Sequence, residues 1–433
     1  MDTREPFNED EAYQLMIDIA LLALVIGLVA MVRVWLTRTP ITAPMVFVGA
    51  GLLLSPFTTG ALDLHLEDES VALLAELTLA FLLFGDATRI DAGVLRQSLV
   101  LPGRLLGIGL PLTVALGTLG TSLLLTDLSW AEAALVAAIL TPTDAALGEA
   151  VVSSPHVPGS VRQALNVESG LNDGLAVPVI AVFLALAAGN EVDGPAVVIG
   201  EALREIAIGV GFGAALAAIL ATLVPKLEDT RWTDLEGLRL LAFATALGAF
   251  AGSTALGGNG FLAAFVAGLV ARQMLGESID SHMELVEDVG QVAASATFVV
   301  FGALLLWPAL EVFSPAVAAC AIGTLTLGRM IPVWLATLGV GLKWQTVAFL
   351  GWFGPRGLAS MVFGLLVLGE PAVEQPDDLF SVVVLVIAGS VLLHGLTAAP
   401  LAKRYGQWFR TQSEIHEMPE AMKVPEARMR GER

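Results

Sequence analysis

Long runs of apolar residues recur along most of the chain and are separated by short polar stretches. Runs of about 18 or more apolar residues suit helices that cross a bilayer, whereas strands of a membrane barrel would alternate over segments of about ten residues. The pattern therefore predicts an all-α polytopic membrane protein with about 13 transmembrane helices. The predicted spans are 13–36, 41–55, 71–87, 101–125, 130–153, 158–187, 203–225, 233–256, 257–275, 284–308, 313–337, 345–369 and 379–402.

Composition supports the membrane class and excludes several kinds of chemistry. Of the 433 residues, 56% are apolar and 15% are charged, against about 25% charged residues in soluble domains. The single cysteine, Cys320, excludes an internal disulfide, and the sequence has neither a Walker A loop nor a zinc-protease motif. We therefore expect a protein surrounded by membrane lipid that is not an enzyme and has no cofactor and no nucleic-acid partner.

The basic residues of the connections predict the orientation, because cytoplasmic loops carry more Lys and Arg. One side of the membrane receives only Arg4 and Arg204. The other side receives Arg33, Arg38, Arg89, Arg96, Arg104, Arg162, Lys226, Arg231, Arg239, Arg272 and Lys343. This places the N-terminus outside and the C-terminus in the cytoplasm of a multi-pass protein of the cell (inner) membrane. Residues 1–402 would form the transmembrane domain, and 403–433 a short cytoplasmic tail.

Three predicted helices contain polar and ionisable residues in their middle. They contribute Asp144 from the fifth helix, Glu168 and Asp173 from the sixth, and Arg356 from the twelfth. A charge at the centre of a membrane costs about 2.5–3.5 kcal/mol on insertion scales. Such groups must pair or face a wet cavity, and Arg356 can neutralise only one of the three acids. The sequence thus predicts spare carboxylate capacity for a cation or for protons.

The spacing along the sixth helix separates two tasks. Glu168 and Asn172 are four residues apart and share one face, so we predict a structural Glu168–Arg356 ion pair braced by Asn172. Ser169 and Asp173 share the adjacent stripe and present a hydroxyl and a carboxylate, which are hard oxygen ligands suited to Na⁺ or Li⁺.

Prolines in the fifth and twelfth helices predict breaks in both. Pro142 and Pro355 remove backbone hydrogen bonds, and a break would free carbonyls such as that of Thr143 to bind an ion. With the seventh helix between two six-helix units, the breaks take matching places in two inverted repeats, as in secondary transporters. Asp144 could also cap a broken half-helix, which does not exclude a ligand role.

Two other polar residues in apolar runs have a simpler interpretation. Arg329 is expected to lie near the cytoplasmic end of the eleventh helix and to extend its guanidinium to the surface. His394 is expected to be an interior polar group whose hydrogen bonds are satisfied.

The motifs resemble those of a known family, the electroneutral cation/proton antiporters, or NhaP-type bacterial sodium/proton exchangers. The resemblance covers about residues 13–402 and is most specific at Glu168-Ser169-Gly170-Leu171-Asn172-Asp173. Thr143-Asp144 resembles the unwound stretch of the fifth helix, and Gly354-Pro355-Arg356-Gly357 the arginine motif of the twelfth. One departure is Ala145 after Asp144, where many relatives have proline.

The resemblance implies a homodimer in which a core of helices 4–6 and 11–13 moves against dimer-forming helices 1–3 and 8–10, with helix 7 as a linker. It implies that Asp173 carries cation and proton alternately, with Ser169, the Thr143 carbonyl and Asp144 completing the cation (metal) site. Asn172, in place of a second Asp, implies one cation per proton.

The expected function is therefore Na⁺ (or Li⁺) exchange for H⁺ by alternating access, in the service of pH homeostasis. K⁺/H⁺ exchange is the main alternative. Two further alternatives are an ion sensor with the transporter fold and an intramembrane aspartyl protease built on Asp144 and Asp173. No Gly-x-Gly-Asp motif supports the protease.

Overall fold

The computed structural model describes residues 9–36, 38–65, 68–90, 100–144, 147–188, 194–368 and 377–413. All regular secondary structure in these ranges is helical, as predicted. The elements are α1 (Glu9–Leu36), α2 (Ala43–Leu54), α3 (Glu69–Thr88), α5 (Val100–Arg104), the π-helix η1 (Leu105–Gly109), α6 (Leu110–Leu124), α7 (Trp130–Ile139), α8 (Glu149–Val152), α9 (Gly159–Ala187), α10 (Gly194–Asp229), α11 (Leu235–Ala255), α12 (Gly260–Leu275), the 3₁₀ helix η2 (Gly276–Ser278), α13 (Ile279–His282), α14 (Glu284–Leu304), α15 (Leu306–Glu311), α16 (Pro315–Leu325), α17 (Leu327–Thr337), α18 (Trp344–Trp352), α19 (Leu358–Leu368) and α20 (Asp377–Ser413).

Each predicted span overlaps one of these helices or a pair of half-helices. Within the described ranges, 10 helical stretches are long and apolar enough to cross a membrane, and the shorter apolar helices are Ala43–Leu54, Trp130–Ile139 and Leu358–Val367. The chain is thus a multi-pass membrane protein, while thirteen crossings and the inverted repeats stay predictions. α20 continues to Ser413, so the first residues of the predicted tail are helical; residues 414–433 lie outside the described ranges.

Both predicted helix breaks are present. α7 ends at Ile139 and the chain runs without helix from Thr141 to Asp144. α18 ends at Trp352 and α19 begins at Leu358. The sequence did not predict a third break, at Thr326, where φ is −112° and ψ is −87°. It divides the eleventh span into α16 and α17.

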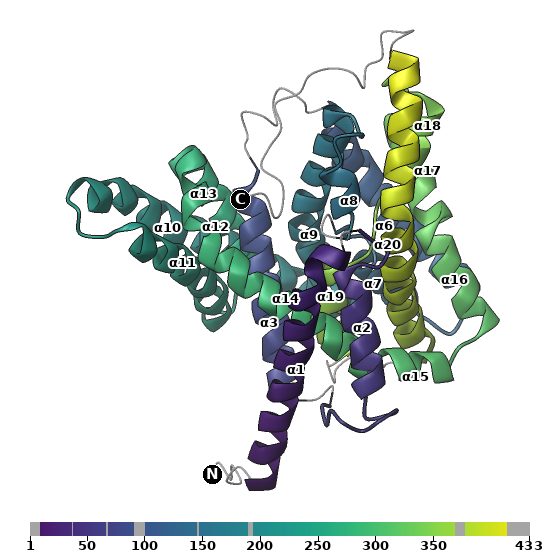
Figure 1. The fold of residues 1–433 in the computed structure, drawn as a ribbon, viewed down its shortest axis with the longest axis horizontal. Helices are drawn as coiled ribbons and strands as arrows, with labels where there is room; N and C mark the ends of the chain where they lie inside the picture. The colour runs from purple at the N-terminus through teal and green to yellow at the C-terminus, as the bar shows by residue number, and fades with distance from the viewer. Residues whose placement is uncertain are drawn as a thin grey trace.

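The helices pack in two groups that meet along α9. α2, α3, α11, α12 and α14 pack on one another, and α10 lies against α12. The close approach of α2 and α14 needs glycine, because a Cβ at Gly302 of α14 would overlap the backbone of Val48 in α2. α6, α7 and α9 form the second group, together with α16–α20. Figure 1 shows α10–α13 on one side of the molecule and α16–α18 with α20 on the other.

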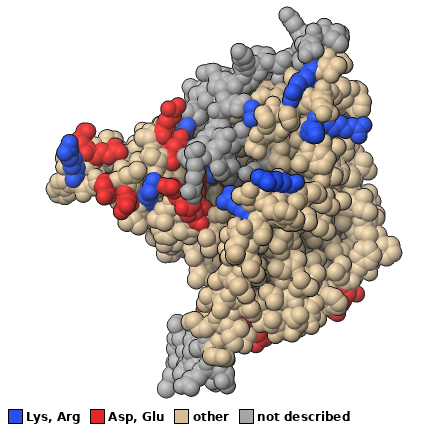
Figure 2. All heavy atoms as spheres, viewed as in Figure 1, with Lys and Arg blue, Asp and Glu red and all other residues tan. Residues whose placement is uncertain are grey.

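The surface is that of a membrane protein. Large apolar side chains such as Met31 (83% exposed), Leu123 (70%) and Ile322 (64%) point outward. A soluble monomer seldom exposes this much contiguous apolar surface. On the face drawn in Figure 2, the blue Lys and Arg side chains of the described residues lie in the upper half of the view.

Candidate ion-binding site

The two predicted breaks cross in the interior and form hydrogen bonds with each other. The backbone N–H of Asp144 donates to the Pro355 carbonyl at 2.8 Å, and the Leu358 N–H donates to Asp144 Oδ2 at 3.0 Å. Because Leu358 is the first residue of α19, Asp144 caps that half-helix and places its negative charge at the positive end of the helix dipole. Gly357 is required here, since a Cβ would overlap the Asp144 carboxylate.

The other side of the crossing is a buried oxygen network on α9. Ser169 Oγ donates to the Thr143 carbonyl at 2.5 Å and lies 3.3 Å from Thr143 Oγ1. Asn172 Nδ2 donates to Thr143 Oγ1 at 2.6 Å. The Oδ1 atom of Asn172 is buried and has no hydrogen-bond partner among the described residues. The structure thus brings Thr143 and Ser169 together as expected, and adds Asn172, which was predicted to brace Glu168.

Asp173 lies on the part of α9 that faces both helix groups. Its side chain is 7% exposed. On one side of it, Ser169 and Asn172 bind the break at Thr143. On the other side, Gly174 packs so closely against the Phe265 ring of α12 that a Cβ would overlap the ring. Asp173 thus lies at the boundary of the two packed groups.

The predicted ion pair of Glu168 with Arg356 is wrong in its cationic partner. Glu168 binds Arg329 in a bidentate pair, with Nη1–Oε1 at 2.5 Å and Nη2–Oε2 at 2.8 Å. Arg329 is 5% exposed and does not extend to the surface, because the break at Thr326 starts a new helix and turns Arg329 inward. Gly354 gives the guanidinium room, since a Cβ there would overlap Arg329 Nε.

Arg356 binds backbone. Its Nη1 donates to the carbonyls of Thr141 and, at 3.4 Å, Pro142, while Nε and Nη2 have no acceptor among the described residues. It is 1% exposed. The guanidinium therefore satisfies carbonyls that the first break leaves without helical partners. Asn172, which was predicted to brace a Glu168–Arg356 pair, binds Thr143 Oγ1.

A short hydrogen-bond chain from α20 holds the second break. The Arg356 N–H donates to Ser390 Oγ at 2.6 Å, and Ser390 Oγ lies 3.0 Å from His394 Nδ1. His394 Nε2 lies 3.0 Å from the Trp352 carbonyl, which can only accept. These contacts suit a neutral His394 with its proton on Nε2. His394 is thus a satisfied interior group, as expected, and the role of Ser390 was missed.

The charges of this cluster do not cancel. Asp144, Glu168 and Asp173 contribute three carboxylates, and Arg329 and Arg356 contribute two guanidinium groups, all within the buried crossing. Among the described residues of the cluster, one excess negative charge remains when all are ionised. A single monovalent cation or a single proton balances it, and hydroxyl, carbonyl and carboxylate oxygens are the ligands that hard cations prefer. The described residues hold no group of three His, Cys, Asp or Glu suited to a multivalent metal.

Comparison with known proteins identifies the class. The profile described as sodium/hydrogen exchanger, transmembrane, matches residues 20–404, so the chain belongs to that family. The family is one of transporters and not of enzymes, which rejects the intramembrane protease. The expected resemblance to NhaP-type antiporters is confirmed by the relatives and by the fold.

Individual relatives agree with this family. The K⁺/H⁺ antiporter NhaP2 of Shewanella sp. (strain ANA-3) is 27% identical over 379 residues, which is 85% of this chain and 64% of that protein. A probable Na⁺/H⁺ antiporter of Schizosaccharomyces pombe is 27% identical over 316 residues, 64% of this chain and 41% of that protein. The sodium proton antiporter MjNhaP1 from Methanocaldococcus jannaschii has the same fold, with a TM-score of 0.70 and 21% identity over 88% of this chain and 99% of that one.

Proposed function

We propose that this protein exchanges one Na⁺ (or Li⁺) for one H⁺ and that Asp173 carries the two in turn. The observation that carries the proposal is the buried oxygen cluster at the crossing breaks, which has one more carboxylate than guanidinium groups. Only a neutralised carboxylate crosses the membrane interior at low cost. A single site that must hold either a cation or a proton then couples the two fluxes.

Asp173 is assigned the carrier role because its two neighbouring acids have structural tasks. Glu168 is held by Arg329 through two hydrogen bonds, and Asp144 caps α19. Ser169, the Thr143 carbonyl and Asp144 complete the cation site in this proposal. The excess of one negative charge favours one cation per proton, which makes the exchange electroneutral.

A second candidate is K⁺/H⁺ exchange. It is favoured by the name of the Shewanella relative, a K⁺/H⁺ antiporter. The ligand chemistry does not choose between the ions, because all of them prefer oxygen donors. Selectivity is therefore a quantity to measure with Na⁺, Li⁺ and K⁺ side by side.

The packing supports a moving core. We assign the core to α5–α9 and α16–α20, the dimer-forming part to α1–α3 and α11–α14, and the linker to α10, in a homodimer. The core would move along the α3–α9 and α3–α19 contacts, which join the two groups. The collection of basic side chains at one end in Figure 2 fits a cytoplasmic end in the inner membrane, with the N-terminus outside.

The test is exchange in proteoliposomes. A pH gradient is imposed with a fluorescent reporter inside, and NaCl, LiCl or KCl is added with the membrane potential clamped or free. The wild-type protein should dissipate the gradient at the same rate in both voltage conditions, and Asp173→Asn should not dissipate it. Asp127→Asn, which alters an exposed loop acid, is the matched control and should behave as wild type. Full-rate exchange by Asp173→Asn would falsify the assignment.

Competition sharpens the same experiment. If one proton and one cation compete for one carboxylate, the apparent affinity for the cation should fall about tenfold per pH unit on the acid side. A slope of about a hundredfold would mean two protons and reject the one-to-one exchange. Cation binding without exchange, from folded protein, would support the ion sensor.

A further inference from the structure

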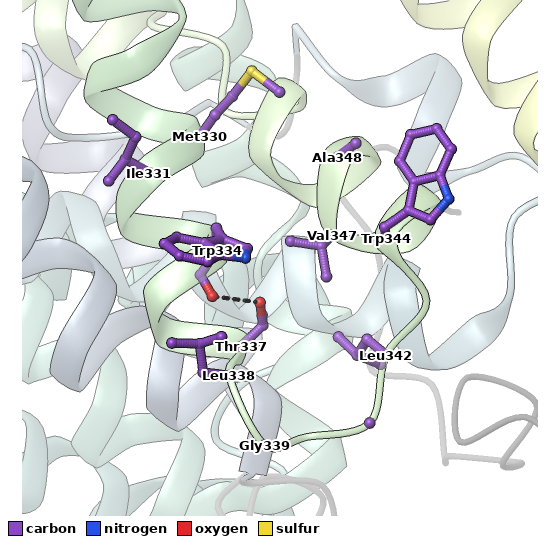
Figure 3. A pocket seen from close by; sticks show the side chains of 11 residues that line it. Met330, Ile331, Trp334, Thr337, Leu338, Gly339, Leu342, Trp344, Val347 and Ala348 are labelled. Atoms are coloured by element: carbon purple, nitrogen blue, oxygen red, sulfur yellow. Dashed lines mark hydrogen bonds between the residues drawn. The ribbon is translucent and has the colours of Figure 1, made fainter.

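A pocket of about 620 Å³, lined by none of the residues of the ion site, opens between α17 and α18. It is lined by apolar side chains with two tryptophans at its edges: Met330, Ile331, Trp334, Leu338, Leu342, Trp344, Val347 and Ala348. Figure 3 shows Trp334 and Val347 on opposite walls, and the connection through Gly339 closing one end. The volume is within the range of about 300–1,000 Å³ that holds small ligands.

The pocket keeps a hollow shape because of the turn between the two helices. Gly339 and Gly341 have φ of +79° and +84°, which side chains other than glycine rarely adopt. They fold the six-residue connection sharply, so that Leu338 and Leu342 face one another across the opening. A flat helix surface would provide no such pocket for an acyl chain.

The rim of the pocket carries groups suited to a lipid headgroup. Arg104 donates through Nε to the Ala336 carbonyl at 2.6 Å and through Nη2 to the Leu338 carbonyl at 2.8 Å, which positions its guanidinium at the end of α17. Arg104 is partly exposed, and its Nη1 atom donates no hydrogen bond to any of the described residues. Lys343 is exposed between the lining residues Leu342 and Trp344.

The two indoles add a second, independent indication. Trp334 is 54% exposed and Trp344 is 74% exposed. Among the described residues neither indole N–H has a hydrogen-bond acceptor, whereas those of Trp307 and Trp352 do. Tryptophans with an apolar body and a free N–H are typical of the membrane–water boundary. The pocket therefore lies at headgroup depth, with its apolar walls toward the acyl chains.

We propose that this pocket binds an anionic phospholipid, with an acyl chain between α17 and α18 and the phosphate at Arg104 and Lys343. Anionic lipid is chosen because both rim charges are positive, and each basic residue near the surface contributes about 1 kcal/mol of attraction, or about a fivefold preference. The site adjoins the ion-binding cluster, since Met330 lines the pocket and follows Arg329.

The two tryptophans are built-in reporters for the test. The full-length protein is placed in phosphatidylcholine bilayers that contain a small fraction of phosphatidylglycerol with brominated acyl chains, which quench tryptophan on contact. Brominated phosphatidylglycerol should quench more than brominated phosphatidylcholine at equal fraction. The extra quenching should vanish when Trp334 and Trp344 are both changed to Phe.

Three variants locate the binding. Lys343→Gln should lower the preference for phosphatidylglycerol about fivefold. Ala348→Phe should remove it by filling the groove while both rim charges remain. Arg33→Gln is the matched control, because Arg33 is an exposed basic residue two positions from the exposed Trp35 and does not line this pocket, and it should change nothing.

Equal quenching by the two lipids would overturn the proposal, because it would reduce the pocket to ordinary lipid-facing surface. A preference that survives Ala348→Phe would also overturn it, because the anionic lipid would then sit elsewhere. None of these readouts requires ion exchange, so they test the lipid site independently of the proposed antiport.

Discussion

Arg329 and Arg356 lie on neighbouring segments, both are almost fully buried, and they bind different kinds of partner. Arg329 binds a carboxylate through two hydrogen bonds, so its charge is compensated by Glu168. Arg356 binds the carbonyls of Thr141 and Pro142, which carry only partial charge. The comparison teaches that one arginine stabilises by neutralising an acid and the other by holding a broken backbone in place.

The largest effect is expected when Arg329 is removed. Arg329→Ala leaves the Glu168 carboxylate buried without its counter-ion, which typically costs about 3–5 kcal/mol. Thermal unfolding in detergent should show the loss, and Arg33→Ala at an exposed position of α1 should not. Because the cost comes from an unpaired charge, Arg329→Ala combined with Glu168→Gln should recover part of it. No recovery in the double variant would contradict the pair.

A smaller effect is expected at Arg356. Arg356→Ala removes charge-assisted hydrogen bonds to two carbonyls, and a loss of about 2–3 kcal/mol is expected. The same unfolding measurement, repeated in a Glu168→Gln background, separates the two arginines. The losses of stability from changing Arg329 and Glu168 should be strongly non-additive. Those from changing Arg356 and Glu168 should be closer to additive, because no direct bond joins these two side chains. Equal coupling energies of the two arginines with Glu168 would contradict the proposal that only Arg329 neutralises this acid.

The positions of the helices and of the two breaks at Pro142 and Pro355 could be predicted from the sequence, because the membrane and the prolines impose them. Apolar runs must be long enough to span, and Pro142 and Pro355 mark backbone that cannot continue as helix. Helical spacing places Asn172 on the face of Glu168 and Ser169 on the adjacent stripe, so it predicts neither hydrogen bond to Thr143. The meeting of Ser169 with the Thr143 carbonyl follows from the family resemblance.

The partner of Glu168 could not be predicted, because it depends on the break at Thr326. Without that break, Arg329 counts as a residue near the end of a continuous helix. The only signals were Gly323, Gly328 and Pro332, which are also common in unbroken membrane helices. Ser390 carried no signal either, since a lone serine in an apolar run reveals no partner.

Adding one methyl group at the crossing tests whether the two breaks depend on each other. Gly357→Ala places a Cβ on the Asp144 carboxylate that caps α19, and overpacking of this kind costs about 1–3 kcal/mol. The expected result is lower stability and slower exchange. Gly120→Ala in α6 is the control, because a Cβ there meets nothing within 4 Å. Unchanged exchange by Gly357→Ala would mean that the cap can be lost without harm to the site.

The smallest effect should come from Ser390, whose hydroxyl accepts a hydrogen bond from the backbone N–H of Arg356. Ser390→Ala removes the acceptor of the Arg356 N–H and the hydroxyl that donates to His394 Nδ1. A loss of about 1 kcal/mol is expected. Ser381→Ala on the same helix is the matched control, because the Ser381 hydroxyl is buried and has no partner among the described residues.

The two serine variants should differ in sign. Removing a satisfied hydroxyl strands its neighbours, whereas removing an unsatisfied one relieves a desolvation cost and leaves stability unchanged or higher. The melting temperature should therefore fall for Ser390→Ala and stay level or rise for Ser381→Ala. If both fall equally, the loss reflects packing in α20, and the hydrogen bond from Arg356 N–H to Ser390 does not contribute measurably to stability.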